Sequence, residues 1–184
     1  MIKMRENAAK LAGRVACVAL DRYADRPRLF TFAESCTGGL LSAVVTSAAG
    51  ISAVYPGGFV TYSNESKSQI LGVSHETLSK FGAVSPECAF EMAKGAKRVM
   101  NADFALSITG VAGPGGGSAL KPVGLVWLAL AARGGRTSLR RLFYPGRSRA
   151  EVRLFAVCAA LRLLLKGFQM EEECNSDGGV ILVG

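Results

Sequence analysis

The stretch LFTFAESCTGGL, residues 29–40, changes character halfway along. Its first four residues are mostly large and apolar and predict a short buried strand, whereas the residues after the two glycines follow a helical pattern. A strand-to-helix junction exposes side chains at the end of a sheet and aims free backbone N–H groups at whatever binds there. Ser35 and Cys36 stand at this junction, so either can attack a carbonyl whose oxyanion the amides hold. The alternative is a Ser/Thr helix cap with glycine for a tight turn.

Strand and helix patterns alternate on both sides of this junction. Helices separate the first three strands, which predicts a largely parallel sheet covered on both faces. A hairpin at Gly134-Gly135 joins the last two strands and makes the sheet mixed. The polar and then Gly/Val-rich stretch 171–184 predicts a flexible tail, with room for a short strand at 180–183. We expect helices over 7–23, 38–49, 64–71, 74–82, 85–100 and 149–166, and strands over 29–33, 59–62, 103–108, 123–132 and 138–144.

Composition restricts the class of protein. The chain has 184 residues, 49% of them hydrophobic, which is enough for one folded domain. No segment approaches the roughly 20 apolar residues of a membrane span. The charged first ten residues lack the pattern of a signal peptide, so we expect a cytoplasmic protein with no membrane partner.

The five cysteines form no CxxC pair and there is a single histidine. We therefore expect no disulfide framework, no metal site and no cofactor.

The net charge of +8 comes from one segment, 133–166, which has nine basic residues and one acidic residue. The other segments balance, with thirteen of each sign. A basic block can bind nucleic acid or a phosphorylated small molecule. Aromatic residues are not interleaved with the basic ones, and no helix-turn-helix or zinc-finger pattern is present. We therefore favour a solvated surface for most of these arginines and expect no nucleic-acid partner.

Three loops are expected to meet at one end of the sheet, because ligands in such folds lie off the carboxyl ends of strands. These loops are 34–39, 62–67 and 109–117. A serine there needs a base, and the lone histidine, His75, is expected to be an exposed residue in the first turn of a helix. That argues against a Ser-His-Asp triad and leaves lysine as the common alternative.

Lys67 lies one turn into the helix 64–71 and suits the role of base. Partial burial and nearby arginine charge are expected to lower its pKa. Tyr62, at the end of the preceding strand, can relay or position a proton. The alternative for Lys67 is an ordinary solvated lysine on a helix. Cys36 ranks below Ser35 as a nucleophile, because no histidine is near to form its thiolate.

The glycine-rich loop 113–117 is neither a P-loop nor a GxGxxG motif, since it opens a strand and no GK[ST] follows. Its glycines permit close approach of the backbone to a ligand, or simply form an exposed loop. Arg147 and Arg149, at the start of the last helix, can grip a phosphate with help from the first amides of that helix.

Six motifs follow one another in a fixed order: AESCTGG (33–39), GGFVTYSNESK (57–67), LGV (71–73), FGAVSPE (81–87), TGVAGPGGG (109–117) and KPVG (121–124). In these motifs the chain, over residues 5–168, resembles the C-terminal domain of the competence/damage-inducible protein CinA. Stand-alone members of that family are nicotinamide-nucleotide amidases. The resemblance implies a three-layer α/β/α sandwich with a mixed, mostly parallel sheet. It also implies hydrolysis of the carboxamide of nicotinamide mononucleotide (NMN) to nicotinate mononucleotide and ammonia.

The motif positions imply the role of each site residue. Ser35 is the expected nucleophile and Lys67 the general base, with Tyr62 beside it. The backbone amides from Cys36 onward are expected to hold the oxyanion, and the other two loops and the last helix to complete the substrate pocket. The substrate-binding residues expected in this way are Cys36, Thr37, Gly38, Gly39, Thr109, Gly110, Gly113, Gly115 and Arg149.

The chain departs from the family pattern in places. Residues 118–120 stand where an acidic residue usually precedes the KPVG motif, and residues 144–149 replace a common Gly-Asp-Arg. We expect one amidase domain over 1–168 and a tail over 169–184 without a family counterpart. A homo-oligomer is expected, with the apolar last helix as a candidate interface. The alternative function is a non-catalytic nucleotide-binding module in a competence or DNA-damage response.

Overall fold

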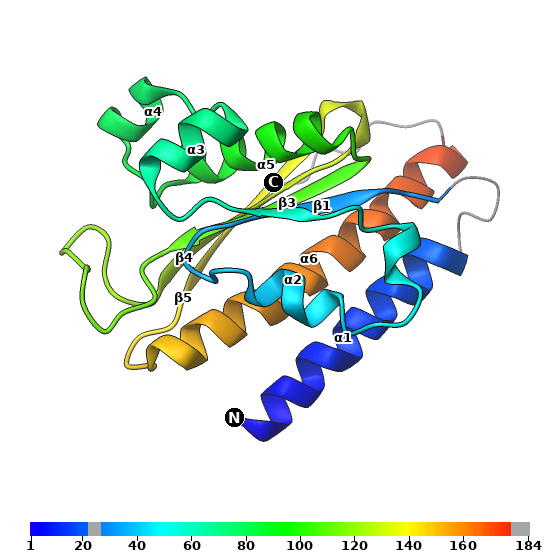
Figure 1. The fold of residues 1–184 in the computed structure, drawn as a ribbon, viewed down its shortest axis with the longest axis horizontal. Helices are drawn as coiled ribbons and strands as arrows, with labels where there is room; N and C mark the ends of the chain where they lie inside the picture. Colours follow the sequence, from blue (N-terminus) through cyan, green and yellow to red (C-terminus); the bar gives the residue numbers. More distant parts are fainter. Residues whose placement is uncertain (22–26, 178–184) are drawn as a thin grey trace.

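The computed structural model describes residues 1–21 and 27–177. Its sheet has five strands in the order β2-β1-β3-β4-β5 (Figure 1). β1 pairs in parallel with β2 and β3, whereas β4 pairs antiparallel with β3 and β5, so the sheet is mixed as predicted. The strands are β1 (Phe30–Glu34), β2 (Gly58–Val60), β3 (Phe104–Gly110), β4 (Leu125–Ala131) and β5 (Thr137–Phe143).

Helices cover both faces of the sheet, which confirms the predicted three-layer sandwich (Figure 1). One layer holds α3, α4 and α5, and the other holds α1, α2 and α6. The helices are α1 (Ile2–Asp21), α2 (Leu40–Val45), α3 (Asn64–Leu71), α4 (His75–Lys80), α5 (Pro86–Met100) and α6 (Arg149–Asp177), with short 3₁₀ turns η1 (Ile51–Ala53) and η2 (Arg133–Gly135).

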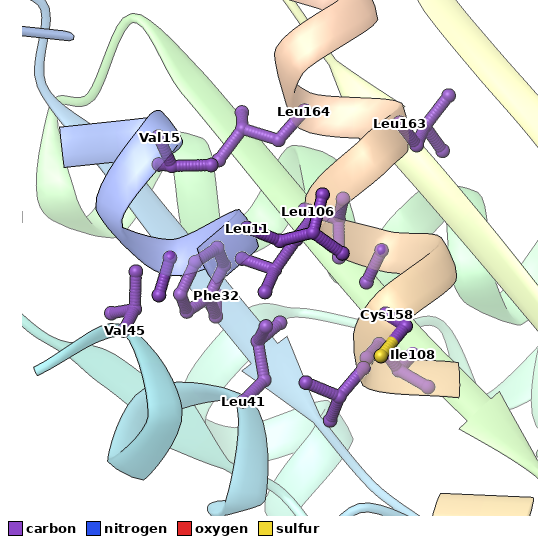
Figure 2. Packing of buried hydrophobic residues seen from close by; sticks show 14 of the residues in the cluster. Leu11, Val15, Phe32, Leu41, Val45, Leu106, Ile108, Cys158, Leu163 and Leu164 are labelled. Atoms are coloured by element: carbon purple, nitrogen blue, oxygen red, sulfur yellow. The ribbon is translucent and has the colours of Figure 1, made fainter. Parts of the chain in front are cut away.

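The main core lies between the sheet and the layer of α1, α2 and α6. Alternate residues of the central strands face this layer, among them Phe32 of β1 with Leu106 and Ile108 of β3, all fully buried. Figure 2 shows Phe32 and Leu106 beside Leu11 of α1, and Ile108 beside Cys158 of α6. Burying each such side chain contributes roughly 1.5–3 kcal/mol. This packing fixes the strand from which the serine-bearing junction begins.

On the opposite face, α5 lies close to the sheet because Ala89 and Ala93 pack on alanines of β4. The same helix also passes close to the end of α3. A Cβ built on Gly95 of α5 would lie 2.0 Å from the carbonyl oxygen of Leu71, so only glycine permits this approach. The contact sets the position of α3, which carries Lys67.

Serine caps begin the three helices of this layer. The side-chain oxygens of Ser63, Ser74 and Ser85 each accept a hydrogen bond from a backbone N–H three residues later. Ser74 and Ser85 are the first residues of the helices that the sequence predicts over 74–82 and 85–100, and such caps stabilise a helix by about 1 kcal/mol. The Ser63 cap fixes the start of α3 one turn before Lys67.

Three helices differ from their predicted bounds by four residues or more. α1 begins at Ile2 rather than at residue 7, and α2 ends at Val45 rather than at residue 49. α2 begins at Leu40 rather than at residue 38, because Gly38 and Gly39 have φ values of 56° and 89°, outside the helical region. α6 continues to Asp177, well into the tail predicted over 169–184. The helix passes Gly167 because Phe168 is fully buried and packs on rings of the sheet.

The apolar side of α6 is used inside the molecule. Its leucines are largely buried in the core that the sheet and α1 share, which removes the expected apolar interface on this helix. Residues 22 and 23 of the predicted first helix, and the suggested strand at 180–183, lie outside the described residues. Within residues 1–21 and 27–177, no helix is long and apolar enough to cross a membrane.

Candidate active site

The carboxyl ends of β1, β2 and β3, the glycine-rich loop and the start of α6 gather at one end of the sheet (Figure 1). They surround a cavity of about 280 Å³. The three loops that the sequence predicted to converge therefore do so. The cavity is lined by Ser35, Cys36, Tyr62, Lys67, Ala83, Val84, Thr109, Gly110, Val111, Ala112, Gly113, Gly115, Gly116 and Arg149.

Ser35 directly follows β1 and is held by the sheet. Its backbone N–H donates a hydrogen bond of 2.9 Å to the carbonyl of Ile108, which extends the pairing of β1 with β3 by one residue. The Ser35 side chain is 8% exposed and lines the cavity. The nucleophile predicted from the sequence thus lies on a rigid element with its hydroxyl at the cavity wall.

Lys67 is fully buried and reaches the serine from α3. Its Nζ donates to Ser35 Oγ at 3.0 Å, to the carbonyl of Thr61 at 2.7 Å and to the carbonyl of Tyr62 at 3.4 Å. Among the described residues no carboxylate forms an ion pair with this ammonium. The lysine is therefore positioned by neutral acceptors, one of which is the candidate nucleophile.

Burial lowers the pKa of Lys67 below its ordinary value of 10.5, because desolvation disfavours the charged ammonium. The thiols of Cys88 and Cys36 act in the opposite direction. The expected lowering is present, but its cause is the burial alone, since no arginine contributes to it. A buried lysine with a lowered pKa can be a neutral amine nearer to physiological pH, and it can then take the proton of a serine.

Cys36 also lines the cavity, but it is a poor nucleophile. Burial raises the pKa of its thiol to about 12, although the charges of Arg153 and Lys67 oppose this shift. The thiol is therefore protonated at neutral pH, and only a thiolate attacks readily. This result supports the choice of Ser35 over Cys36.

Tyr62 and Arg149 meet at the mouth of the cavity. Arg149 donates through one nitrogen to the Tyr62 hydroxyl at 2.6 Å and through another to the carbonyl of Gly113 at 2.7 Å. The Tyr62 side chain is 58% exposed. No hydrogen bond within the described structure joins its hydroxyl to Ser35 or Lys67, so its role in proton transfer stays a prediction.

Only one of the two arginines considered for phosphate binding faces the cavity. Arg149 lines it, whereas Arg147 forms an ion pair of 3.7 Å with Glu151 and packs over the ring of Phe155. The Arg147 side chain is 54% exposed. The geometry therefore favours Arg149.

Thr109 closes the side of the cavity next to α5. Its hydroxyl donates to the carbonyl of Ala83 at 2.6 Å, which ties the end of β3 to the segment before α5. Ala83 and Val84 consequently form part of the wall. The sequence motif 81–87 contains them, but small apolar side chains carry no chemical signal and they were not predicted as site residues. Val111, Ala112 and Gly116 also line the cavity. They belong to the loop 109–117 that was expected to complete the pocket, although they were not among the named substrate-binding residues.

Three of the predicted oxyanion-holding residues lie beside the cavity without lining it. The Gly38 N–H donates to the carbonyl of Ser35 at 3.0 Å, and the Thr37 carbonyl accepts from Arg153. Gly39 precedes α2 as its cap residue. Of the four residues, only Cys36 lines the cavity, so its N–H is the candidate oxyanion donor. Substrate contacts by Thr37, Gly38 and Gly39 stay predictions.

Glu34 anchors the junction from within. The side chain is fully buried, and its carboxylate accepts from the N–H of Leu41 at 3.0 Å, the N–H of Ser42 at 2.8 Å and the Ser42 hydroxyl at 2.7 Å. It therefore ties the end of β1 to the first turn of α2. Among the side chains that the structure describes, residues 1–20 and 27–170, no cluster of three or more His, Cys, Asp or Glu residues is arranged to hold a metal ion.

Comparison with known proteins gives a consistent picture. The family model "CinA C-terminal domain" matches residues 14–168. The chain is 51% identical over 138 residues to "Nicotinamide-nucleotide amidohydrolase PncC" of Escherichia coli K12, a match that covers 75% of this chain and 83% of the relative. It is 54% identical over 108 residues to a "CinA-like protein" of Fervidobacterium nodosum, where the match covers 59% of this chain but only 26% of that longer protein.

The fold of this chain is similar to those of solved structures. The competence/damage inducible protein CihA from Agrobacterium tumefaciens aligns with a TM-score of 0.82 and 46% sequence identity, covering 87% of this chain and 94% of that one. A CinA superfamily protein from Klebsiella pneumoniae aligns with a TM-score of 0.81 and 37% identity, covering 89% of this chain and 98% of that one.

Proposed function

The chain belongs to the CinA C-terminal domain family, and from this premise we propose that it is an amidohydrolase acting on the carboxamide of NMN. A relative that is 51% identical, 83% of which is covered, is named a nicotinamide-nucleotide amidohydrolase. The observation that carries the proposal is the 3.0 Å contact between Lys67 Nζ and Ser35 Oγ at the wall of the cavity. The products are nicotinate mononucleotide and ammonia.

The first half of the reaction forms an acyl-enzyme. Ser35 Oγ attacks the carboxamide carbon while the neutral amine of Lys67 takes the serine proton. A C–O bond forms and the carbonyl oxygen becomes an oxyanion. The tetrahedral intermediate collapses with cleavage of the C–N bond, and the ammonium of Lys67 gives its proton to the leaving nitrogen. Ammonia departs, and nicotinate mononucleotide remains bound to Ser35 as an ester.

Water completes the cycle with the same base. Lys67 takes a proton from a water molecule that attacks the ester carbon, and it returns that proton to Ser35 Oγ as the C–O bond breaks. The oxyanion forms twice, and the Cys36 N–H, next to Ser35 at the cavity, is its candidate donor. Loss of one such donor costs other enzymes about 10²–10³-fold in kcat.

Arg149 is the proposed contact for the phosphate of the nucleotide. It lines the cavity and is fixed by Tyr62 and by the carbonyl of Gly113. An arginine held in this way recognises a phosphate by paired N–H donors. Glycines at 113, 115 and 116 keep that side of the cavity free of side chains, so that the backbone can approach the ligand.

Substitution of the nucleophile tests the proposal. Ser35→Ala should abolish ammonia release from NMN, while calorimetry should show NMN binding within a few-fold of wild type. Ser47→Ala, at an exposed serine after α2, is the matched control and should leave turnover unchanged. Wild-type turnover in the Ser35→Ala protein would exclude the covalent mechanism. No ammonia release by the wild-type protein from NMN would exclude the proposed substrate.

A nucleotide-binding module without catalysis is the second candidate, and Lys67 argues against it. A binding site gains nothing from a fully buried ammonium that faces only neutral acceptors, because its desolvation costs stability. Groups with such perturbed pKa values gather at catalytic sites. The buried Ser35–Lys67 pair therefore favours the enzyme.

A further inference from the structure

The turn that carries the nucleophile is held from outside by an arginine of α6. Arg153 donates through Nε to the Thr37 carbonyl at 3.1 Å, and its Nη2 donates to the same oxygen. Within the described structure Arg153 forms no ion pair with a carboxylate. Both of its hydrogen bonds in the described structure thus go to a backbone carbonyl two residues beyond Ser35.

A continuous chain of hydrogen bonds runs from this guanidinium to the nucleophile. The peptide unit between Thr37 and Gly38 accepts from Arg153 through its carbonyl and donates through its N–H to the Ser35 carbonyl at 3.0 Å. The Ser35 carbonyl belongs to the same peptide unit as the Cys36 N–H. Hydrogen bonds linked in series through peptide units polarise and strengthen one another.

The last donor of this chain lies at the cavity. Cys36 lines the cavity wall, and among the groups that the structure describes no other residue accepts a hydrogen bond from its N–H. The charge of Arg153 acts on this residue, since it opposes the burial effect on the Cys36 thiol. The cation at the far end of this series of hydrogen bonds draws electron density from the Ser35–Cys36 peptide unit. The Cys36 N–H therefore becomes a better hydrogen-bond donor.

Glu34 fixes the other end of the turn. Its carboxylate holds the N–H groups of Leu41 and Ser42 at the start of α2, on the far side of the glycines. The turn is therefore held on one side by an anion bound to N–H groups and on the other by a cation bound to a carbonyl. Both contacts restrict the peptide orientations between Ser35 and α2, which preorganises the amides before any substrate binds.

We propose that Arg153 is a positioning residue for the acyl-transfer step: its guanidinium, through the Thr37–Gly38 and Ser35–Cys36 peptide units, orients and polarises the Cys36 N–H that holds the oxyanion. The inference rests on the proposed amidase function for its chemistry. It is distinct from the role of Arg149, which contacts the substrate cavity itself. Arg153 touches no reacting atom and acts only through the turn.

Steady-state kinetics with NMN test this role. Arg153→Met should lower kcat for NMN roughly tenfold, below the 10²–10³-fold loss of a direct donor, with KM changed less than about twofold. Arg153→Lys, which keeps one donor and the charge, should recover part of the loss. Arg162→Met, at an exposed arginine of the same helix, should match wild type.

The thioamide analogue of NMN separates an oxyanion role from general damage to the fold. Sulfur accepts hydrogen bonds more weakly than oxygen, so an enzyme with a strong oxyanion donor prefers the oxygen substrate. Arg153→Met should reduce this preference. Equal losses on the two substrates would overturn the proposal and leave Arg153 with a structural role only.

Amide NMR of the free protein tests the inference without any turnover. In Arg153→Met, and to a smaller degree in Arg153→Lys, the amide proton of Gly38 should move upfield because its hydrogen bond to Ser35 weakens. The amide proton of Cys36 should move upfield because its peptide unit is less polarised, while amides of β4 stay in place. Unchanged shifts at Gly38 and Cys36 would refute the relay even if NMN is hydrolysed. Shifts as expected with no NMN hydrolysis by wild type would refute the proposed substrate and leave the relay standing.

Discussion

Lys67 Nζ and Ser35 Oγ lie 3.0 Å apart, although 32 residues separate them in the chain. The contact joins the ends of two neighbouring parallel strands, since Ser35 follows β1 and Lys67 lies in the helix that follows β2. Because the lysine is fully buried and faces only neutral acceptors, we expect the pair to lower the stability of the fold and, under the proposed mechanism, to raise the reactivity of Ser35. These two effects can be measured separately.

Replacing the lysine should separate activity from stability. Lys67→Met should lower ammonia release about 10³-fold, the range expected for loss of a general base. Its thermal midpoint should equal or exceed that of wild type, because an apolar side chain of similar length replaces a buried ammonium. Lys10→Met, at an exposed position in α1, is the control for both assays. A large fall in the midpoint of Lys67→Met alone would show that Lys67 stabilises the fold.

The pKa of Lys67 predicts how stability depends on pH. Because this pKa is below 10.5 in the folded protein, the unfolded chain binds more protons between the folded pKa and 10.5, and stability rises with pH across that window. The cost of burying the ammonium is present in full below the folded pKa and disappears toward pH 10.5. Urea unfolding at several pH values should therefore show the advantage of Lys67→Met over wild type shrinking as pH rises. A constant difference would mean that Lys67 does not titrate in this window.

The thiol beside the nucleophile should be dispensable. Burial raises the pKa of Cys36 to about 12, so iodoacetamide at pH 7.5 should inactivate the enzyme slowly or not at all. Cys36→Ala should keep kcat within a few-fold of wild type, because the proposed contribution of this residue is its backbone N–H. Inactivation by iodoacetamide that is lost in Cys36→Ala would instead indicate an accessible thiolate.

The phosphate contact should appear in substrate preference. Arg149→Met should raise KM for NMN about tenfold, because a loss of roughly 1.4 kcal/mol of charge-assisted hydrogen bonding weakens binding tenfold. It should change KM for nicotinamide riboside much less. Arg147→Met, at the arginine that pairs with Glu151, should leave both KM values unchanged. Parallel steady-state assays of the two substrates measure this. Equal effects on nucleotide and riboside would place the phosphate elsewhere.

Local signals in the sequence were enough for much of this site. The strand-to-helix change around Ser35, the start of α5 and the helix that carries Lys67 depend on neighbouring residues, so local sequence patterns predicted them. The parallel order of the first strands then implied that their following loops converge. The sequence therefore predicts Ser35 and Lys67 at one site, and both line the same cavity.

The features of the site and of α6 that the sequence did not predict depend on contacts between residues far apart in the chain. The Thr37 carbonyl is held by Arg153, 116 residues away, so no local pattern shows which amides of the turn remain available. The length of α6 depends on the burial of Phe168 against the sheet rather than on helix-ending residues. The wall at Ala83 is set by the Thr109 hydroxyl, and alanine itself gives no functional signal.

The glycine contact between α5 and α3 should link packing to catalysis. A Cβ on Gly95 would lie 2.0 Å from the backbone oxygen of Leu71, which cannot rotate away. Gly95→Ala should therefore cost about 1–3 kcal/mol of unfolding free energy, as overpacked cores do. It should also lower kcat, because the displaced α3 carries Lys67.

Gly13→Ala is the matched control for this prediction. No atom lies within 4 Å of a Cβ built on Gly13, which is exposed in α1. Alanine there should add up to about 1 kcal/mol of stability through helix propensity and leave kcat unchanged. Urea unfolding together with ammonia release measures both variants. If Gly95→Ala loses stability but keeps wild-type kcat, the position of α3 tolerates movement, and the Lys67–Ser35 contact does not depend on close packing of the two helices.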